Sequence, residues 1–434
     1  MKKYHEIIES KYFIGVLALV AFISWITNIP YIAMSIYFLI AWYILLFNGP
    51  TKVFIPILIN LLFISRTDYN LNDFPVLLTM GGIISLVLII YYLIRYKIDL
   101  KKCNLKLSFL LFAICSVISL INLDAGDEPI RYFLSLAPVL YFFIYIFLAG
   151  SIKEDQSSYL CISMIASGFI MSLEFITAGV VQGNLFYEVV DFAWYGPNTM
   201  GIYLNMIIIA IAYLIVKTDK LGLKIAYYSV IMFFYSVIYI GHSRGVIASI
   251  LVYLFPTIGL VIKGSTNRKH DIPLVCICFT IALISIFLTW DIVLFTFNLG
   301  YHLNGREVLW PGAIKEFLNH PIIGQGLFSD SITYLWDTNK VLAVHNTYIQ
   351  TLLSFGVIGA FVYIFHTFEK IKLIFKNKHP FIKFLLAIWL AATVHGCLDS
   401  TMYMIGFMMY YICIFAVVDN LDVGEENGDL CSCW

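Results

Sequence analysis

The sequence has 434 residues, of which 61% are hydrophobic and 12% are charged, and its mean hydropathy is +0.88. A soluble domain is about half apolar and about a quarter charged, so this composition indicates an integral membrane protein. It excludes a soluble enzyme and a nucleic-acid-binding protein. The 27 basic and 27 acidic residues leave no net charge, and the nine cysteines show no metal-like CxxC spacing.

Apolar runs of the length that a membrane helix needs, about 17 to 25 residues, occur along the whole chain. We therefore expect an all-α polytopic membrane protein with 12–14 transmembrane helices, built as a single transmembrane domain over residues 1–418. The third of fourteen candidate segments is short enough to be re-entrant. In chain order the candidates are Tyr12–Ile29, Pro30–Phe47, Val53–Ser65, Pro75–Ile94, Leu107–Asn122, Ile130–Gly150, Ser158–Gly179, Asn198–Val216, Lys224–Gly241, Val246–Ile262, Ile272–Phe297, Asn346–Phe368, Phe381–Leu398 and Met402–Val418.

The positions of lysine and arginine predict the orientation of these segments. With the N-terminus in the cytoplasm and strict alternation, 21 of the 27 cationic side chains fall in inside connections. An error of one helix would scramble this partition, so the alternation supports fourteen segments with both termini inside. The six outside cations are candidates for binding an anion: Arg66, Arg131, Arg244, Arg306, Lys315 and Lys340.

Two connections differ from the rest. The only long outside connection covers residues 298–345, and we expect it to form an extracytoplasmic loop with short amphipathic helices. Residues 419–434 are acidic and lack periodicity, which predicts a disordered cytoplasmic tail.

A short turn at residues 241–245, GHSRG, joins two expected spans on the outside. Glycines flank the turn, so Arg244 is expected to project at the outer membrane surface. An arginine in this position commonly snorkels to lipid headgroups, and that explanation stands beside a role in binding an anionic ligand.

Within the long loop, Asn304 followed by Glu307 resembles a capping box that opens a helix. We expect this helix over Val308–Asn319, lying along the outer membrane face and ended by Pro321. Arg306 at its start is placed to bind an anion beside the free amide groups of the helix N-terminus. The alternative for Arg306 is a surface ion pair with a neighbouring glutamate.

His345 and Asn346 lie where the loop enters the next span. Asn346 is a favourable N-cap, which places His345 just outside the helix on the aqueous side. An imidazole there can take a proton from a hydroxyl group at neutral pH, although a polar residue that supports the cap is the simpler explanation. Gly356 and Gly359 on the same span are expected to permit close helix packing.

Two arginines and a histidine on one side of a membrane suit group transfer from a lipid diphosphate. Guanidinium groups bind diphosphate oxygens and stabilise the charge that grows on the leaving group. A general base activates the attacking hydroxyl. No metal or other cofactor is expected, because the outside acids at residues 124–128 lack ligand spacing.

The second half of the chain resembles the O-antigen ligase and polymerase superfamily. The first half agrees only in its hydrophobicity. One departure is Pro311 directly after Trp310, which is expected to kink the loop helix. The motifs that carry the resemblance are Tyr195-Gly196-Pro197-Asn198, Ser243-Arg244-Gly245, Gly305-Arg306 with Trp310, Pro321–Gly326 (PIIGQG), His345-Asn346 and Gly356–Gly359 (GVIG).

The resemblance implies a multi-helical GT-C-type fold that uses undecaprenyl-diphosphate-linked oligosaccharides at the outer face of the bacterial cytoplasmic (inner) membrane, without metal or nucleotide sugar. Carried over by position, Arg244 and Arg306 would hold the donor diphosphate, and His345 would be the catalytic base or would position the acceptor. Three further residues are predicted to bind substrate: Asn198, Lys315 and Asn346.

Two activities of the superfamily share this donor. A polymerase transfers the growing glycan onto the next lipid-linked repeat unit, and a ligase transfers the finished glycan to lipid A-core. We favour an O-antigen (surface polysaccharide) polymerase, because each polysaccharide requires its own polymerase. The Ile-, Lys-, Phe- and Tyr-rich composition also suggests an AT-rich gene, which is usual for polysaccharide gene clusters. A polymerase would also predict a chain-length-regulating co-polymerase as a partner.

Two other classes of function remain as alternatives. A lipid-linked oligosaccharide transporter would use ionisable residues inside the membrane, for which Glu174, His366, His395 and Asp399 are the candidates. Glu174 and Asp399 are expected to be wet near the outer ends of their spans, and His395 to pair with Asp399. A scaffold without chemistry would leave the outside arginines unexplained.

Overall fold

The structure is a computed structural model that describes residues 2–65, 74–124, 130–183, 185–186, 190, 196–298, 306–327, 329 and 344–421. Over these residues the chain forms helices and no strand, which confirms the predicted all-α polytopic class. Four residues singled out in the sequence lie outside the described residues: Arg66, Tyr195, Asn304 and Lys340.

The helices of the first half are α1 (Lys2–Ile8), α2 (Lys11–Thr27), α3 (Pro30–Phe47), η1 (Thr51–Val53), α4 (Phe54–Asn60), η2 (Leu61–Ile64), α5 (Phe74–Tyr96), α6 (Lys106–Ser119), η3 (Leu120–Asn122), α7 (Ile130–Ser135), α8 (Ala137–Ser151) and α9 (Ser157–Gln182). Those of the second half are α10 (Pro197–Lys217), α11 (Leu221–Ile240), α12 (Arg244–Gly264), α13 (Arg268–Leu288), α14 (Trp290–Asn298), α15 (Arg306–Phe317), α16 (Thr347–Lys376), α17 (Pro380–Gly396), η5 (Thr401–Tyr403) and α18 (Ile405–Val418).

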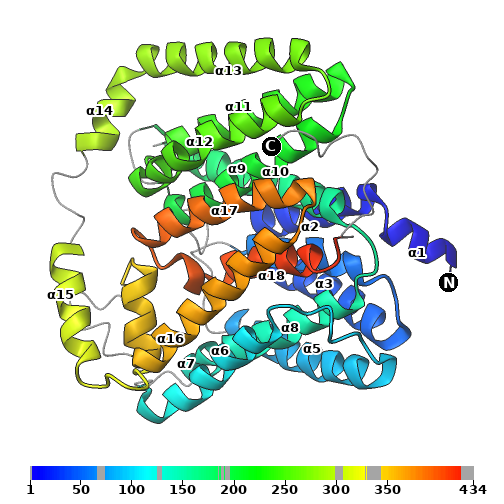
Figure 1. The fold of residues 1–434 in the computed structure, drawn as a ribbon, viewed down its shortest axis with the longest axis vertical. Coiled ribbons are helices and arrows are strands. Elements are labelled where there is room, and N and C mark those ends of the chain that lie inside the picture. The colour runs from blue at the N-terminus through cyan, green and yellow to red at the C-terminus, as the bar shows by residue number, and fades with distance from the viewer. Residues whose placement is uncertain are drawn as a thin grey trace.

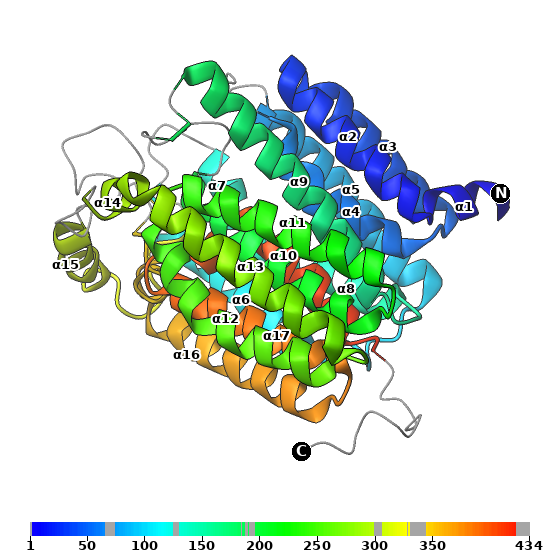
Figure 2. The same cartoon turned by 90° about the horizontal axis from the view of Figure 1, so that it is seen from above.

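The helices follow the fourteen predicted segments in position. Eight of the described helices are long and apolar enough to cross a membrane, and six more segments are shorter apolar helices. Most of the bundle helices lie side by side, running across the view in Figure 1 and diagonally in Figure 2. Hydrophobic runs are therefore a sufficient guide to where these helices lie.

Contacts group the connections into the two ends that the lysine and arginine count predicts. At the predicted inner end, the ammonium of Lys52 lies 2.9 Å from Glu9, and Asn104 donates a 2.7 Å hydrogen bond to Asp419. At the predicted outer end, Asn122 donates a 2.9 Å hydrogen bond to the carbonyl oxygen of Gly324. Which end faces the cytoplasm stays a prediction.

The short third segment forms η1, α4 and η2, and the seven residues of α4 are all buried. Thr51 at its start donates a hydrogen bond to the carbonyl oxygen of Ser151 at the end of α8. Two residues at the same end of the bundle must be separated by an even number of membrane crossings. Between Thr51 and Ser151, helices α5, α6 and α8 supply three crossings, and the third segment is the remaining one. The contact therefore favours a third segment that also crosses. Its broken backbone is compatible with a membrane because it is surrounded by protein.

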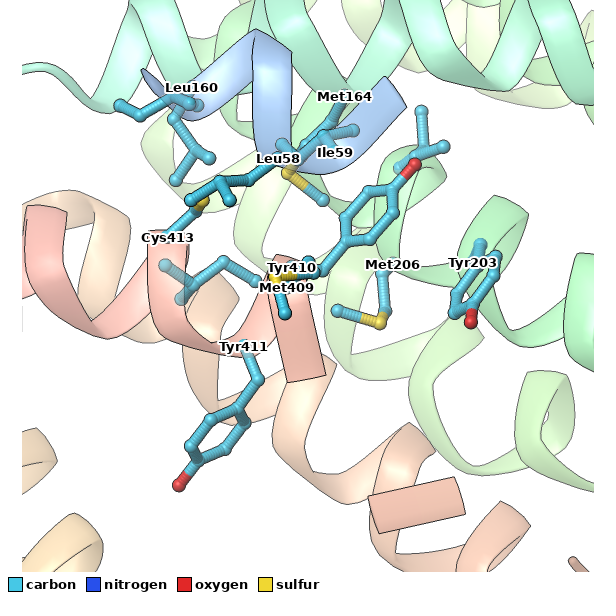
Figure 3. Close-up of a cluster of buried hydrophobic side chains, with 14 of the residues drawn as sticks. Leu58, Ile59, Leu160, Met164, Tyr203, Met206, Met409, Tyr410, Tyr411 and Cys413 are labelled. Atoms are coloured by element: carbon cyan, nitrogen blue, oxygen red, sulfur yellow. The ribbon is translucent and has the colours of Figure 1, made fainter. Parts of the chain in front are cut away.

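The core lies where α4, α9, α10 and α18 meet. Figure 3 shows Leu58, Met164 and Tyr410 from three of these helices close together. Helix α10 is the most enclosed of the eight long spans, with 89% of its apolar window buried. The described start of the predicted tail also packs inward: Asn420 donates a 2.8 Å hydrogen bond to the carbonyl oxygen of Ala149. Residues 422–434 lie outside the described residues.

Helix α15 lies at the outer end of the bundle, beside the start of α16 (Figure 1). The sequence predicted a helix at Val308–Asn319, and the structure has it at Arg306–Phe317, continuing through Pro311 as one helix. This helix brings part of the long loop onto the bundle, where the predicted site residues gather.

Candidate active site

The predicted site residues are organised around one turn between α17 and η5, here called the site turn (Cys397–Ser400). Its backbone is fixed by hydrogen bonds from the amides of Leu398 and Asp399 to the carbonyl oxygen of His395, at 2.9 and 2.8 Å. The turn is formed because α17 ends at Gly396, and each of its residues then offers backbone groups to neighbouring segments. Three segments that are distant in the sequence contact it.

His345 binds the site turn through its imidazole. Its Nδ1 lies 3.0 Å from Oδ1 of Asp399, which is itself buried, whereas the His345 side chain is 36% exposed. The backbone at His345 is left-handed, with φ of 51°, a conformation that non-glycine residues adopt mainly where surrounding structure imposes it. The result is an imidazole held at Nδ1 in a side chain that stays partly exposed.

The charge state of Asp399 supports this arrangement. Burial alone would raise the pKa of Asp399, but the hydrogen bond and charge of His345, with contributions from His395 and the amide of Ser400, bring it below its ordinary value. An ionised Asp399 accepts a hydrogen bond from Nδ1–H of His345. The second nitrogen, Nε2, is then the basic one, as in other aspartate–histidine pairs.

Asn346 fixes His345 from the following position. Its side-chain oxygen accepts hydrogen bonds from the amides of Tyr348 and Ile349, both at 3.0 Å, which confirms the predicted N-cap of α16. Its amide nitrogen donates to the carbonyl oxygen of Cys397 at 2.9 Å. Asn346 therefore ties the start of α16 to the site turn. Its predicted contact with substrate stays a prediction.

Arg306, the first residue of α15, binds the same turn. Its Nη2 donates a 2.9 Å hydrogen bond to the carbonyl oxygen of Leu398, the neighbour of Asp399. One turn further along, the indole nitrogen of Trp310 donates to the carbonyl oxygen of Val344, directly before His345. The guanidinium and the imidazole are thus held on adjacent residues of one turn.

The other end of α15 is anchored by the PIIGQG segment at residues 321–326. The side-chain amide of Gln325 donates to the backbone oxygen and to Oε1 of Glu316, at 3.0 and 2.9 Å. This segment docks into a break in α16, where the amide of Gly326 bonds the carbonyl oxygen of Ser354 and that of Val357 bonds the carbonyl oxygen of Pro321. The docked segment supplies partners for backbone groups that the broken helix releases.

The break in α16 depends on Gly356. Its φ is 65°, and a Cβ atom there would lie 2.3 Å from the carbonyl oxygen of Ile322. Close helix packing was therefore the wrong explanation for Gly356, because its role is to let the docked segment approach. A Cβ on Gly359 would instead collide with the side chain of Phe355 in the same helix, and close packing of Gly359 against another helix stays a prediction.

Arg244 is placed at this end by the start of α12. The hydroxyl of Ser243 caps the helix by accepting from the amide of Val246 and donates to the side-chain oxygen of Asn198. The next residue, Gly245, packs on the site turn: a Cβ there would lie 3.6 Å from Cβ of Leu398. The half-buried Arg244 stands between these two contacts.

The first turns of three helices, α12, α15 and α16, meet at the site turn, and the first turn of α10 lies beside it. The contacts of α12, α15 and α16 are those above, and for α10 the backbone of Asn198 makes a hydrogen bond with His395. A helix N-terminus carries a partial positive charge and unpaired amide groups that favour anions. Together with two arginines, this arrangement favours a diphosphate, and the sequence did not reveal it.

Two predicted features lie differently. Lys315 is exposed in the last turn of α15, nine residues and about 13 Å along the helix from Arg306. The predicted pairing of His395 with Asp399 was wrong, because Nδ1 of His395 bonds the hydroxyl of Thr401 at 2.8 Å. The expectation that Asp399 is wet was also wrong, since it is 3% exposed, as it was for Glu174, at 0%.

Asp399 is a residue of the site that the sequence alone did not place there, because it was considered only as an intramembrane residue of a transporter and as a partner of His395. The sequence signal that could have identified it is its position directly after a predicted span on the outside, four residues after His395.

His242 is a further buried residue of this end: burial lowers its pKa, and its Nε2 lies 2.8 Å from the carbonyl oxygen of Phe186. It supports the turn that precedes Arg244.

A comparison with protein families matches residues 227–364 to the family described as O-antigen ligase. The match begins in α11 and ends within α16, so it includes Arg244, Arg306 and His345 but neither Asn198 nor Asp399. No curated protein matches the chain.

Proposed function

Because residues 227–364 match the family described as O-antigen ligase, we propose that the protein is a membrane glycosyltransferase that transfers a glycan from an undecaprenyl diphosphate donor to an acceptor hydroxyl at the outer face of the inner membrane. The observation that carries the proposal is the half-exposed His345, bound by Asp399 on the turn that also binds Arg306. This places a base and a cation within one short stretch of backbone.

The proposed reaction is a single inverting displacement. Nε2 of His345 takes the proton of the acceptor hydroxyl as its oxygen attacks the anomeric carbon of the first donor sugar. The bond from that carbon to the diphosphate oxygen breaks, and undecaprenyl diphosphate leaves with the electron pair. Arg244 and Arg306, with the helix N-termini beside them, stabilise the negative charge of the leaving group.

Asp399 acts in this scheme as a positioning residue. It holds the imidazole in the tautomer that leaves Nε2 basic and stabilises the imidazolium that forms after proton transfer. Lys315 lies on the exposed face of α15, where it can meet the charged or polar part of a long glycan. The scheme assigns the electrostatic work to arginine side chains, and activity that survives chelation of divalent metal is the expected result.

For the acceptor, we propose another lipid-linked repeat unit, which makes the enzyme a polymerase. A ligase is the second candidate, because the matching family is described as O-antigen ligase. Deletion of the gene in the native host, followed by gel analysis of surface polysaccharide, separates them. Lipid A-core with a single repeat unit supports the polymerase, and bare core with accumulated lipid-linked polymer supports the ligase.

A third result of the deletion experiment would overturn both candidates. Bare core with no outward-facing glycan would indicate a transporter, and the role of His345 as a base would then be wrong. The same strain complemented with an Asp399→Asn variant provides a control, because a transporter without transfer chemistry would not require the pair between Asp399 and His345.

A further inference from the structure

A cavity that is open on one side lies between α16 and α17, on the membrane side of the site turn. One face of α17 lines it at helical spacing, from Leu385 through Ile388, Ala392 and Gly396. It is distinct from the proposed transfer site, which lies above the site turn.

The walls of the cavity are aromatic and apolar, and one side is open. Phe407, Tyr411 and Phe415 of α18 form a buried floor. Figure 3 shows the ring of Tyr411 pointing away from the other labelled core side chains. Tyr363 of α16 and Trp389 of α17 are only half-buried, so the cavity opens between these two helices, where lipid chains surround the bundle.

Lys370 lines this cavity and is 2% exposed. Its described contacts are the ring faces of Tyr411 and Tyr363, at 5.3 and 6.0 Å. Within the part of the chain that the structure describes, no carboxylate lies within ion-pair distance of its ammonium, and the neighbouring Glu369 pairs with Lys372. A buried ammonium with only aromatic contacts is costly, and such a residue inside a membrane marks a binding site.

The cavity differs at its two ends. Its outer end is closed, because the hydroxyl of Thr347 donates to the carbonyl oxygen of Asp399 and a Cβ on Gly396 would lie 3.1 Å from that hydroxyl. Lys370 stands at the other end, beyond the break at Gly356 and six residues before Lys376, where α16 ends at the predicted inner side. The charge therefore lies at the depth of the predicted inner leaflet headgroups.

We propose that this cavity binds an anionic phospholipid of the inner leaflet, with its phosphate on Lys370 and one acyl chain between α16 and α17. Charge complementarity selects this occupant: the phosphate supplies the counter-ion that the described residues around Lys370 do not provide. A polyprenyl chain that entered from the donor side would have to pass the closed outer end, and would set hydrocarbon against the ammonium.

The test is the lipid that remains bound to the purified full-length protein, identified and counted by mass spectrometry. We expect phosphatidylglycerol or another anionic phospholipid to co-purify with wild type, and Lys370→Met to reduce its affinity about tenfold or more. Lys372→Met is the matched control, because Lys372 is on the same helix and 65% exposed. Lys370→Arg keeps the charge and should keep the lipid.

A second variant tests the cavity without touching the cation. Ala392→Phe fills the space beside α17 and should also release the lipid, while Lys370 stays in place. In phosphatidylcholine nanodiscs, added phosphatidylglycerol should raise the melting temperature of wild type and of Lys372→Met, and of neither cavity variant. Unchanged lipid content in Lys370→Met, or in Ala392→Phe if the first variant does not fold, overturns the proposal. So does recovery of a polyprenyl diphosphate as the retained lipid.

Discussion

Two pairs, each of an acidic and a basic side chain, join neighbouring segments at opposite ends of the molecule. At the predicted inner end, Lys224 of α11 binds Asp271 of α13 at 2.5 Å, and both side chains are fully buried. At the predicted outer end, Asp399 is buried but its partner His345 is 36% exposed. The closed pair has no access for a substrate, so it can only hold helices together. The half-open pair keeps one nitrogen available for proton transfer.

The surroundings of the two aspartates reinforce this contrast. Asp271 also accepts hydrogen bonds from the hydroxyls of Ser265 and Tyr228, so its carboxylate is occupied within the bundle. Asp399 accepts from the amide of Ser400 and from His345, both through Oδ1. A buried pair of charges is weak support for stability by itself, but removing one partner leaves an uncompensated charge. Mutations at the two ends should therefore differ in kind.

The largest expected effect is loss of the half-open pair. His345→Gln should reduce the transfer rate by about 10² to 10⁴, because general-base catalysis contributes a factor of that size. The measurement is polymer formation per folded molecule, from purified enzyme and a lipid-linked repeat unit. Asp399→Asn should lose most of the same factor, and the double variant should lose little more than His345→Gln, since the two residues act as one unit. Additive losses would contradict the pairing.

Breaking the closed pair should change stability and leave the chemistry intact. Lys224→Met leaves Asp271 as an unpaired buried charge, which costs about 3 to 5 kcal/mol of unfolding free energy. Combining it with Asp271→Leu should restore most of that loss, because two apolar side chains no longer need a counter-ion. Thermal melting and activity per folded molecule are measured together. A large fall in activity per folded molecule would show that the inner pair is coupled to the site.

The sequence predicted the helices well and the site in part, for physical reasons that differ. Hydrophobic length is a local property, so segments such as Pro30–Phe47 could be located directly. Arg244, Arg306 and His345 stood out because cations are disfavoured in outside connections. Asp399 was misassigned because its partner depends on how α16 approaches α17. The role of Gly356 depends on a segment more than 30 residues earlier in the chain, which docks into the helix break.

Replacing Arg306 by lysine tests whether the outer end uses the geometry of the guanidinium or its charge alone. Lysine keeps the charge but lacks the planar fork that binds two diphosphate oxygens, and cannot hold Leu398 and a ligand in the same way. We expect a loss of about 100-fold in rate, similar to removing one donor from an oxyanion site. Lys315→Met, on the exposed end of α15, is the control and should retain nearly full activity with a short acceptor. An Arg306→Lys enzyme as active as wild type would rule out the bidentate role.

The smallest expected effect is a change in how stability depends on pH, at two buried carboxylates. Asp399 lies at the predicted outer end and Asp419 at the predicted inner end. Asp399 has a lowered pKa, so its ionised form stabilises the fold above the unfolded value of about 3.9, and this stability is lost as the pH falls through the lower folded value. Asp419, just beyond α18, is the reverse case. Burial raises its pKa to about 6, partly offset by hydrogen bonds from Tyr145 and Asn104.

The two carboxylates should therefore give opposite changes in melting temperature. For Asp419 the folded state holds the proton more tightly, so wild-type stability decreases as the pH rises from about 4 to about 6. Asp419→Asn removes this titration, so its stability relative to wild type should rise over that interval, by at most about 3 kcal/mol in free energy. Asp399→Asn should instead fall further below wild type as the pH rises from about 3 to about 5. Equal pH profiles for the two variants would mean that the two ends do not hold their carboxylates in opposite charge states.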